Sequence, residues 1–431
     1  MQLVNAIATP AAEKPRGKVR WIVCALLFAA VALSYIDRLV LPVLKPELQA
    51  RYAWSEQGYA DLAIAFQAAY GIAYVLFGRF VDRVGAKIGY AVAVTLWTIG
   101  HVAHALFTSA GMMIFARIPL AIGEAGAFPA ALAAANEWFP QRERALAIGI
   151  FNAGSNVGAI LTPLIVPVIA VTFGWRMAFI ATGALTVIWL VAWLAFYRTP
   201  RKHRRVTPEE LAWIEADPVP AAKPVRWRTL LRLRQTWAYM LGRFLIDPVW
   251  WTFLFWLPDF FNRQYGVKML DFGPPLVAVY VLADVGSIAG GWFSSRLLSK
   301  GATPNRARKT ALFVCALFAL PIIFAAQAPG LWWAVAAIGL ACACHQGFSA
   351  NVYAIPGDLF PRGMGGSVIG LGGLAGACGG MLMAKFAGTI LAGVGSYGPI
   401  FAVAGCAYLV ALLVIHLLVP HYTPVDPERL A

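Results

Sequence analysis

The chain has 431 residues, of which 60% are hydrophobic and only 13% are charged, and its formal net charge is +15. This composition is typical of integral membrane proteins and excludes an ordinary soluble domain. The six cysteines lie in apolar segments, without the spacing of a metal site or a disulfide framework, so we expect no metal site and no cofactor.

A membrane-spanning helix needs about 20 apolar residues, and twelve segments of the chain meet this requirement. They cover residues 21–43, 59–81, 87–108, 112–136, 145–171, 176–197, 237–261, 275–298, 309–327, 331–355, 365–392 and 397–419. Proline and glycine inside several spans are tolerable because neighbouring helices satisfy the freed backbone groups. The expected fold class is therefore an all-α integral membrane protein with twelve transmembrane helices.

The positive charge is not distributed as a nucleic-acid-binding surface would require. With both termini placed in the cytoplasm, most of the 35 Lys and Arg residues fall on the inner side, beginning with four between Lys14 and Arg20. Five fall outside: Lys45, Arg51, Arg176, Arg263 and Lys268. This bias follows the positive-inside rule, and it predicts cytoplasmic termini, a retained first span and no nucleic-acid partner.

One long stretch of low hydropathy divides the twelve spans into six and six. We expect residues 1–197 to form an N-terminal six-helix bundle, 198–236 a cytoplasmic linker and 237–431 a C-terminal six-helix bundle. Within the linker, the sequence Thr207-Pro-Glu-Glu210 predicts the start of a short helix, with Pro at its first position and acidic residues in its first turn.

The two halves resemble each other in sequence. Gly78-Arg-Phe-Val-Asp-Arg83 after span 2 is similar to Gly291-Trp-Phe-Ser-Ser-Arg296 after span 8, and Glu137-Trp-Phe-Pro140 is similar to Asp358-Leu-Phe-Pro361. Two glycines of span 5 correspond to two of span 11, Gly149 to Gly370 and Gly158 to Gly379. Two homologous halves suit a transporter whose site lies at their interface and opens alternately to each side.

Four charged residues inside spans 1 and 4 are the strongest functional signal. A charge at the bilayer centre costs about 2.5–3.5 kcal/mol, so such residues usually handle a substrate, an ion or a proton. Tyr35 and Arg38 share a helix face, Asp37 points about 100° away, and Arg117 and Glu124 lie two turns apart on one face. We expect Arg117 to pair with Asp37, which leaves Arg38 for a substrate carboxylate and Glu124, farther from an arginine, as the acid more readily protonated. The alternative is a salt-bridge network that only joins spans 1 and 4.

The loop motif Gly78-x-x-x-Asp82-Arg83-x-Gly85-x-Lys87 resembles the signature of the major facilitator superfamily. Three segments resemble its anion:cation symporter branch: Ser34–Arg38, Ala116–Pro129 and Asn136–Pro140. Two more, Asp247–Pro258 and Ala283–Ser287, resemble bacterial hexuronate transporters. The resemblance implies proton coupling through Asp37 and Glu124 with Arg117, and a substrate carboxylate on Arg38. It also implies an inner gate formed by Asp82, Arg83, Glu137, Arg144 and Asp358.

A sugar acid also needs partners for its hydroxyl groups and its ring. The candidates beside Arg38 are Tyr35, Tyr70, Asn152, Asn156, Trp250, Trp251, Gln346 and Asn351. The amides can instead form hydrogen bonds between helices, and the tryptophans can simply pack. Four further polar residues of the spans receive no role from the sequence: Asp247, Asp284, Lys385 and His345.

The sequence therefore predicts a proton-coupled symporter of a small-molecule sugar-acid anion in a bacterial inner membrane. The expected substrate is a hexuronate (glucuronate or galacturonate), and the expected protein is a monomer that uses no cofactor besides the co-transported proton. An aldonate symporter (galactonate or gluconate) is the alternative substrate class, and an organic-anion channel is the alternative mechanism. The chain has no phosphate-loop, zinc-protease or serine-nucleophile motif, which argues against a primary pump or a membrane hydrolase.

Overall fold

The computed structural model describes residues 17–216, 227–360 and 365–425, and the regular elements in these ranges are all helices. The α-helices are α1 (Val19–Tyr52), α2 (Glu56–Ala103), α3 (Ala110–Trp138), α4 (Gln141–Phe173), α5 (Trp175–Phe196), α6 (Pro208–Ile214), α7 (Trp227–Leu230), α8 (Arg234–Tyr265), α9 (Gly273–Ser299), α10 (Pro304–Ala319), α11 (Leu331–Leu359), α12 (Gly365–Gly393) and α13 (Gly398–Leu418). Four 3₁₀ segments are η1 (His104–Leu106), η2 (Pro200–Lys202), η3 (Met269–Asp271) and η4 (Leu320–Gln327).

The described helices account for the twelve predicted spans. Ten segments are long and apolar enough to cross a membrane, and one of them is α2, which contains two spans. At Gly85 the helical geometry of α2 breaks with φ 79° and ψ 166°, a conformation that favours glycine, and the chain turns back so that Gly89 packs on Val81. The remaining span is α8, whose 32 residues are long enough although its charged residues lower its hydropathy.

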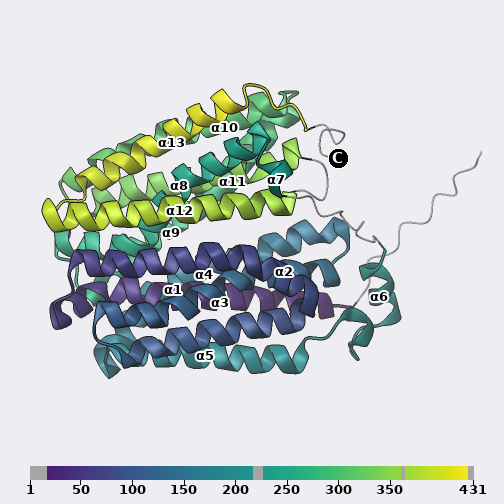
Figure 1. Cartoon of the computed structure of the whole chain (residues 1–431), viewed down its shortest axis with the longest axis horizontal. Helices are drawn as coiled ribbons and strands as arrows, with labels where there is room; N and C mark the ends of the chain where they lie inside the picture. The colour runs from purple at the N-terminus through teal and green to yellow at the C-terminus, as the bar shows by residue number, and fades with distance from the viewer. Residues whose placement is uncertain (1–16, 217–226, 361–364, 426–431) are drawn as a thin grey trace, which may run out of the picture.

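The spans form two groups that lie against each other (Figure 1). Helices α1 to α5, here called the N-half, occupy the lower part of the view, and α8 to α13, the C-half, occupy the upper part. The halves contact each other through α2 with α12, α1 with α8, and α4 with α9. Residues from these three helix pairs are therefore the ones that can form a site between the halves.

The internal repeat seen in the sequence is also present in the packing. A side-chain carbon on Gly158 of α4 would collide with the Ala32 carbonyl of α1, and one on Gly379 of α12 would collide with the Phe244 carbonyl of α8. The other corresponding pair, Gly149 and Gly370, faces open space at both positions. Equivalent glycines thus bring equivalent helix pairs together in the two halves, as two homologous bundles require.

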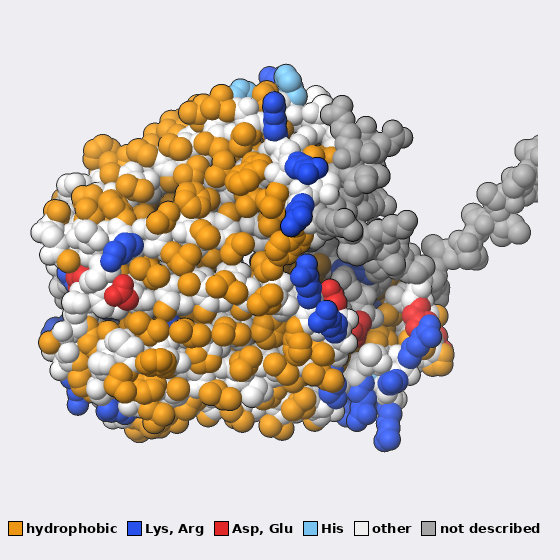
Figure 2. Space-filling view, viewed as in Figure 1, with side chains coloured by type: hydrophobic (Ala, Val, Ile, Leu, Met, Phe, Trp, Pro, Cys, Tyr) orange, Lys and Arg blue, Asp and Glu red, His pale blue; other side chains and the backbone are white. Residues whose placement is uncertain are grey.

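An apolar belt surrounds the molecule, and its charged side chains gather at one end (Figure 2). Lys and Arg are concentrated toward the end where α6 lies, here called the basic end, whereas α1 ends and α2 begins at the opposite, far end. Large apolar side chains such as Phe115 and Ile288 are 72% and 74% exposed. In a multi-pass membrane protein such side chains face lipid rather than water.

The predicted helix start in the linker is confirmed. Thr207 precedes α6, and its hydroxyl accepts a hydrogen bond from the Glu210 amide at 3.2 Å. Glu210 is fully buried, lies 3.2 Å from the Arg20 guanidinium, and accepts from the first amides of α1, those of Val19 and Arg20. Arg20 also pairs with Glu143 of α4 at 2.9 Å. The linker is thereby fixed to the basic end of the N-half by a carboxylate at a helix N-terminus.

We expect Glu210→Ala to lower the melting temperature of the protein in detergent, because removing one partner from a buried ion pair costs about 3–5 kcal/mol. Glu209→Ala is the matched control, since Glu209 lies on the same short helix but is exposed. Thermal unfolding monitored by intrinsic fluorescence compares the two variants. Equal melting temperatures for Glu210→Ala and the wild type would contradict this role of the linker.

Candidate functional site

Arg38 of α1 and Glu124 of α3 form a buried ion pair on the side of the N-half that meets the C-half. Two guanidinium nitrogens of Arg38, Nε and Nη2, each lie 2.7 Å from Glu124 Oε2. The two residues are only 4% and 2% exposed. Oε1 of Glu124 has no hydrogen-bond partner among the described residues. The pair is electrically neutral as long as Glu124 is ionised, and it leaves one carboxylate oxygen unused.

Aromatic rings surround the Arg38 guanidinium. Its central carbon lies 4.6 Å from the centre of the Tyr35 ring, 5.3 Å from Tyr70, 5.5 Å from Phe66 and 5.4 Å from Trp251. These residues come from α1, α2 and α8, so Arg38 contacts both halves of the molecule. Cation–π contacts stabilise a desolvated guanidinium without neutralising its charge. An anion that reached this point would find a positive charge enclosed by ring faces and edges.

The predicted ion pair between Arg117 and Asp37 is wrong. Arg117 donates to the backbone carbonyl of Arg38 at 3.4 Å and lies 4.7 Å from the centre of the Phe66 ring. Asp37 points into the N-half, where its Oδ2 accepts from Thr186 at 2.9 Å. The prediction failed because relative height along two helices does not fix the direction of each side chain around its helix. Glu124 is also not far from an arginine, since it is the residue that pairs with Arg38.

Three of the substrate candidates, Tyr35, Tyr70 and Trp251, meet at Arg38. The others lie elsewhere. Trp250 stacks on His345 inside the C-half at 5.3 Å, and Asn351 donates to the carbonyls of Gly290 and Gly347, which gives it a packing role in this conformation.

The remaining amide candidates lie apart from the aromatic rings around Arg38. Asn156 of α4 lies near Asp284 of α9, where these two helices bring the halves into contact. Asn152 is exposed and Gln346 is half-buried. The structure therefore brings Tyr35, Tyr70 and Trp251 to Arg38, whereas Trp250 lies inside the C-half and the amide candidates lie at other positions between and within the halves.

The sequence analysis missed two residues of the site, Phe66 and Gln67. Phe66 contacts both Arg38 and Arg117. Gln67 is fully buried, and neither its amide nitrogen nor its oxygen has a hydrogen-bond partner among the described residues. It lies next to Trp251 and to Gly380 of α12. The signal for Gln67 was available, because Gln67, Tyr70 and Tyr74 repeat at helical spacing on one face of α2.

A network of charges joins the halves at the far end. Lys45 of α1 lies 2.9 Å from Asp259 of α8 and 3.0 Å from Glu56 of α2, and Arg263 of α8 contacts both of these acids. Tyr397 also donates to Asp259. Among the described residues, the ion pairs between the halves lie at this end, here called the far-end lock. The far side of the molecule is thus held closed.

The predicted gate residues at the basic end have their described partners within their own half. Glu137 accepts from Tyr197 at 2.8 Å, Asp358 pairs with Arg308 at 3.0 Å, and Arg144 donates to the Phe139 carbonyl at 3.0 Å. Asp82 and Arg83 are exposed beside the Gly85 turn. These contacts do not join the two halves.

The residues without a predicted role divide into packed and exposed ones. Asp247 pairs with Arg243 one turn earlier on α8 at 2.5 Å, as the sequence spacing allowed. The ring nitrogens of His345 form hydrogen bonds with Tyr408 and Ser349 within the C-half. Lys385 is exposed on α12.

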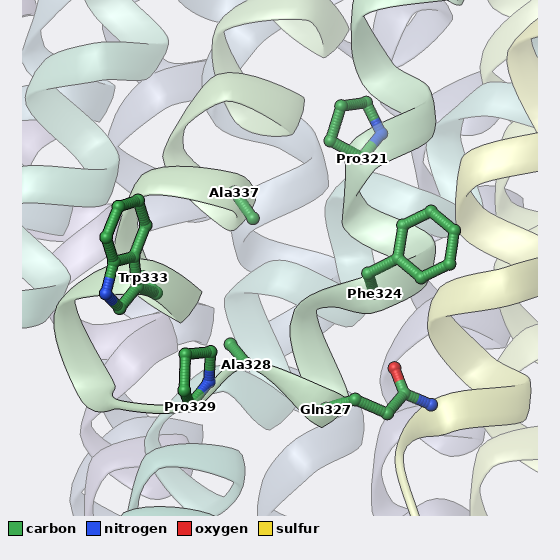
Figure 3. A pocket seen from close by; sticks show the side chains of 7 residues that line it. All are labelled: Pro321, Phe324, Gln327, Ala328, Pro329, Trp333 and Ala337. Atoms are coloured by element: carbon green, nitrogen blue, oxygen red, sulfur yellow. The ribbon is translucent and has the colours of Figure 1, made fainter.

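A surface pocket of about 570 Å³ lies between η4 and the start of α11, away from the charged site (Figure 3). Phe324 and Trp333 face each other across it, and both are 70% exposed. Its lining contains one polar side chain, that of Gln327. Such an open apolar hollow on a membrane-spanning surface fits lipid chains rather than a charged ligand.

Comparison with known proteins identifies the family. The model of the Major Facilitator Superfamily matches residues 26–384. The hexuronate transporter of Escherichia coli (strain K12) is 33% identical over 410 residues, which cover 92% of this chain and 93% of that protein. The galacturonate transporter of Dickeya chrysanthemi is 34% identical over 280 residues, which cover 64% of this chain and 81% of that protein. The D-galactonate transporter of Escherichia coli O6:H1 is 28% identical over 421 residues, 94% of this chain and 97% of that protein.

A solved structure shows the same fold. The bacterial homolog to the human lysosomal transporter Spinster, crystallised in an inward-facing and unoccupied conformation, matches with a TM-score of 0.69 at 20% identity. The match covers 95% of this chain and 97% of that one. Taken with the family match over most of the sequence, these findings show that the chain belongs to the Major Facilitator Superfamily and is a multi-pass membrane transporter rather than an enzyme.

Proposed function

We propose that the chain is a proton-coupled symporter of a monocarboxylate sugar acid, with hexuronates such as glucuronate and galacturonate as substrates. The observation that carries this proposal is the Arg38–Glu124 ion pair enclosed by aromatic rings from both halves. The guanidinium group matches a carboxylate in shape and charge, and in this structure a carboxylate of the protein occupies it. A substrate carboxylate and Glu124 would compete for the same cation.

Proton coupling follows from this competition. A proton on Glu124 removes the negative charge that neutralises Arg38, and the substrate anion then replaces it. The site is neutral when it is empty, and it is neutral again when proton and substrate are both bound. With only one of the two bound, a buried charge stays unpaired, which is costly in a low-dielectric interior. The site would therefore change its access from one side of the membrane to the other only when it is empty or when it holds both proton and substrate. Transport of the two together in this way is symport.

The sugar-acid assignment is supported by the relatives and by the lining of the site. Proteins named as hexuronate, galacturonate and D-galactonate transporters align with nearly all or much of the chain. The ring faces of Tyr70 and Trp251 suit the apolar face of a sugar ring, and the unpartnered amide of Gln67 can bind a sugar hydroxyl.

For the membrane arrangement, we propose that the basic end lies in the cytoplasm, because Lys and Arg gather there. Both termini would then be cytoplasmic, and the far-end lock would close the outer side. Residues 1–197 and 237–431 would move as the two rocking bundles, with residues 198–236 between them. One chain already supplies every residue around Arg38, so a monomer suffices as the transport unit.

The proposal is tested by uptake of labelled glucuronate into proteoliposomes with an imposed proton gradient. We expect the wild type to accumulate glucuronate, to lose this accumulation with a protonophore, and to be inhibited by galacturonate more than by gluconate or galactonate. Glu124→Gln should abolish accumulation and retain glucuronate exchange, since the amide cannot carry the proton. Asp61→Asn, which alters an exposed carboxylate on α2, is the control and should behave like the wild type.

Each failure has a distinct meaning in this experiment. Accumulation by Glu124→Gln equal to that of the wild type would overturn the assignment of the proton. Stronger inhibition by aldonates would move the substrate class to galactonate or gluconate. Flux that neither saturates nor shows counterflow would indicate a channel.

Gln67→Leu should raise the KM for glucuronate about three- to tenfold, because one neutral hydrogen bond contributes about 0.5–1.5 kcal/mol. The melting temperature should stay the same or rise, because the substitution removes a buried polar group that has no partner. Gln57→Leu, nearer the far end of α2, is the matched control. An unchanged KM in Gln67→Leu would exclude Gln67 from the substrate site.

A further inference from the structure

Asp37 occupies a polar cluster inside the N-half that the substrate mechanism does not use. Its Oδ2 accepts from Thr186 at 2.9 Å and from Trp97 Nε1 at 3.2 Å, and its Oδ1 lies 3.2 Å from His101 Nε2. Asp37 and His101 are both fully buried. Arg38, the next residue, faces Glu124 and the aromatic rings instead. The two acids therefore lie on different sides of α1, one at the substrate site and one in the bundle core.

The charge balance of this cluster requires a proton. No Lys or Arg nitrogen lies within ion-pair distance of Asp37 in the described part of the chain, and an unpaired carboxylate at this depth is costly. The titratable and charged groups that face His101 are Asp37 from α1, Arg117 from α3 and His104 from η1. The uncharged hydroxyl of Thr182 from α5 lies 2.7 Å from His101 Nε2. One proton, either on Asp37 or on His101, makes the Asp37–His101 pair stable.

His104 extends this cluster toward the far end. Its ring lies 6.4 Å from that of His101, measured between ring centres, and its Nδ1 lies 2.8 Å from the Gly100 carbonyl oxygen. Nδ1 must therefore carry a hydrogen, which leaves Nε2 as the acceptor. Neither His104 Nε2 nor His101 Nδ1 has a hydrogen-bond partner among the described residues. His104 is the first residue of η1, whose last residue, Leu106, is 77% exposed at the far end.

We propose that His101 shares a proton with Asp37, and that His104 and His101 deliver protons to Asp37 from the far end by a route separate from the substrate path. The route runs within α2 and η1 of the N-half, whereas the substrate path lies between the halves and is closed at the far end by the lock. His101 Nε2 and Asp37 Oδ1 lie 3.2 Å apart but are not aligned as a hydrogen bond, so the imidazole must turn from Thr182 toward Asp37 before a proton passes between these two atoms. No bond other than to hydrogen forms or breaks. This inference rests on the proposed proton coupling.

The test compares three variants in proteoliposomes: His101→Gln, His104→Gln and the control Thr95→Val. Glutamine at position 101 retains a donor to Asp37 and Thr182 but cannot carry a proton. We expect His101→Gln to retain glucuronate exchange, to lose at least about tenfold in proton-driven accumulation, and to lose the pH dependence of the initial uptake rate. Thr95→Val alters an exposed threonine of α2 outside this cluster, and it should retain both properties.

His104→Gln tests the route itself. It should slow proton-driven uptake severalfold and leave the final accumulation unchanged, because a relay affects the rate and not the equilibrium. Accumulation and pH dependence like the wild type in His101→Gln would overturn the role of His101. If that variant does not fold, an unchanged uptake rate in His104→Gln decides against the proposal. A wild type without gradient-driven accumulation would instead contradict the proton coupling on which the inference rests.

Discussion

The burial of the Arg38 guanidinium is the constraint on which the other features of the site depend. A cation that is 4% exposed inside a membrane-spanning helix bundle needs a negative partner, and Glu124 is that partner in this structure. The aromatic rings around it exclude water and strengthen the attraction between the charges. Any substrate anion must therefore replace a carboxylate of the protein. Within the Arg38 site, this requirement by itself links anion binding to protonation of Glu124.

The position of this cation also explains why it can respond to the movement of the halves. Phe66 and Tyr70 come from the N-half, whereas Trp251 comes from the C-half, so the enclosure is complete only while α8 lies against α1 and α2. The lock at the far end holds this arrangement through charges of both halves. Opening at that end would separate α8 from the ring of aromatics and expose Arg38. The interface between the halves therefore controls both the access to Arg38 and the surroundings of its charge.

Much of the fold followed from the sequence, because hydropathy and the repeated motifs act over whole segments. The correspondence of Gly158 with Gly379 even identified two equivalent helix contacts. The pairing of charges could not be predicted in the same way. Asp37 and Arg38 are neighbours, and the rotation of α1 decides which of them meets α3; that rotation depends on packing with α4 and α5. The far-end lock was missed because its α8 members, Asp259 and Arg263, are distant in sequence from Lys45 and Glu56.

Proton uptake on substrate binding tests the central claim most directly. Glucuronate is added to the purified protein in weakly buffered detergent solution, and the pH change is recorded alongside binding. The account predicts that about one proton is taken up for each glucuronate bound, and that Glu124→Gln binds glucuronate without this uptake. Binding by the wild type without proton uptake across the pH range of transport would show that the substrate does not replace Glu124 on Arg38, and would contradict the account.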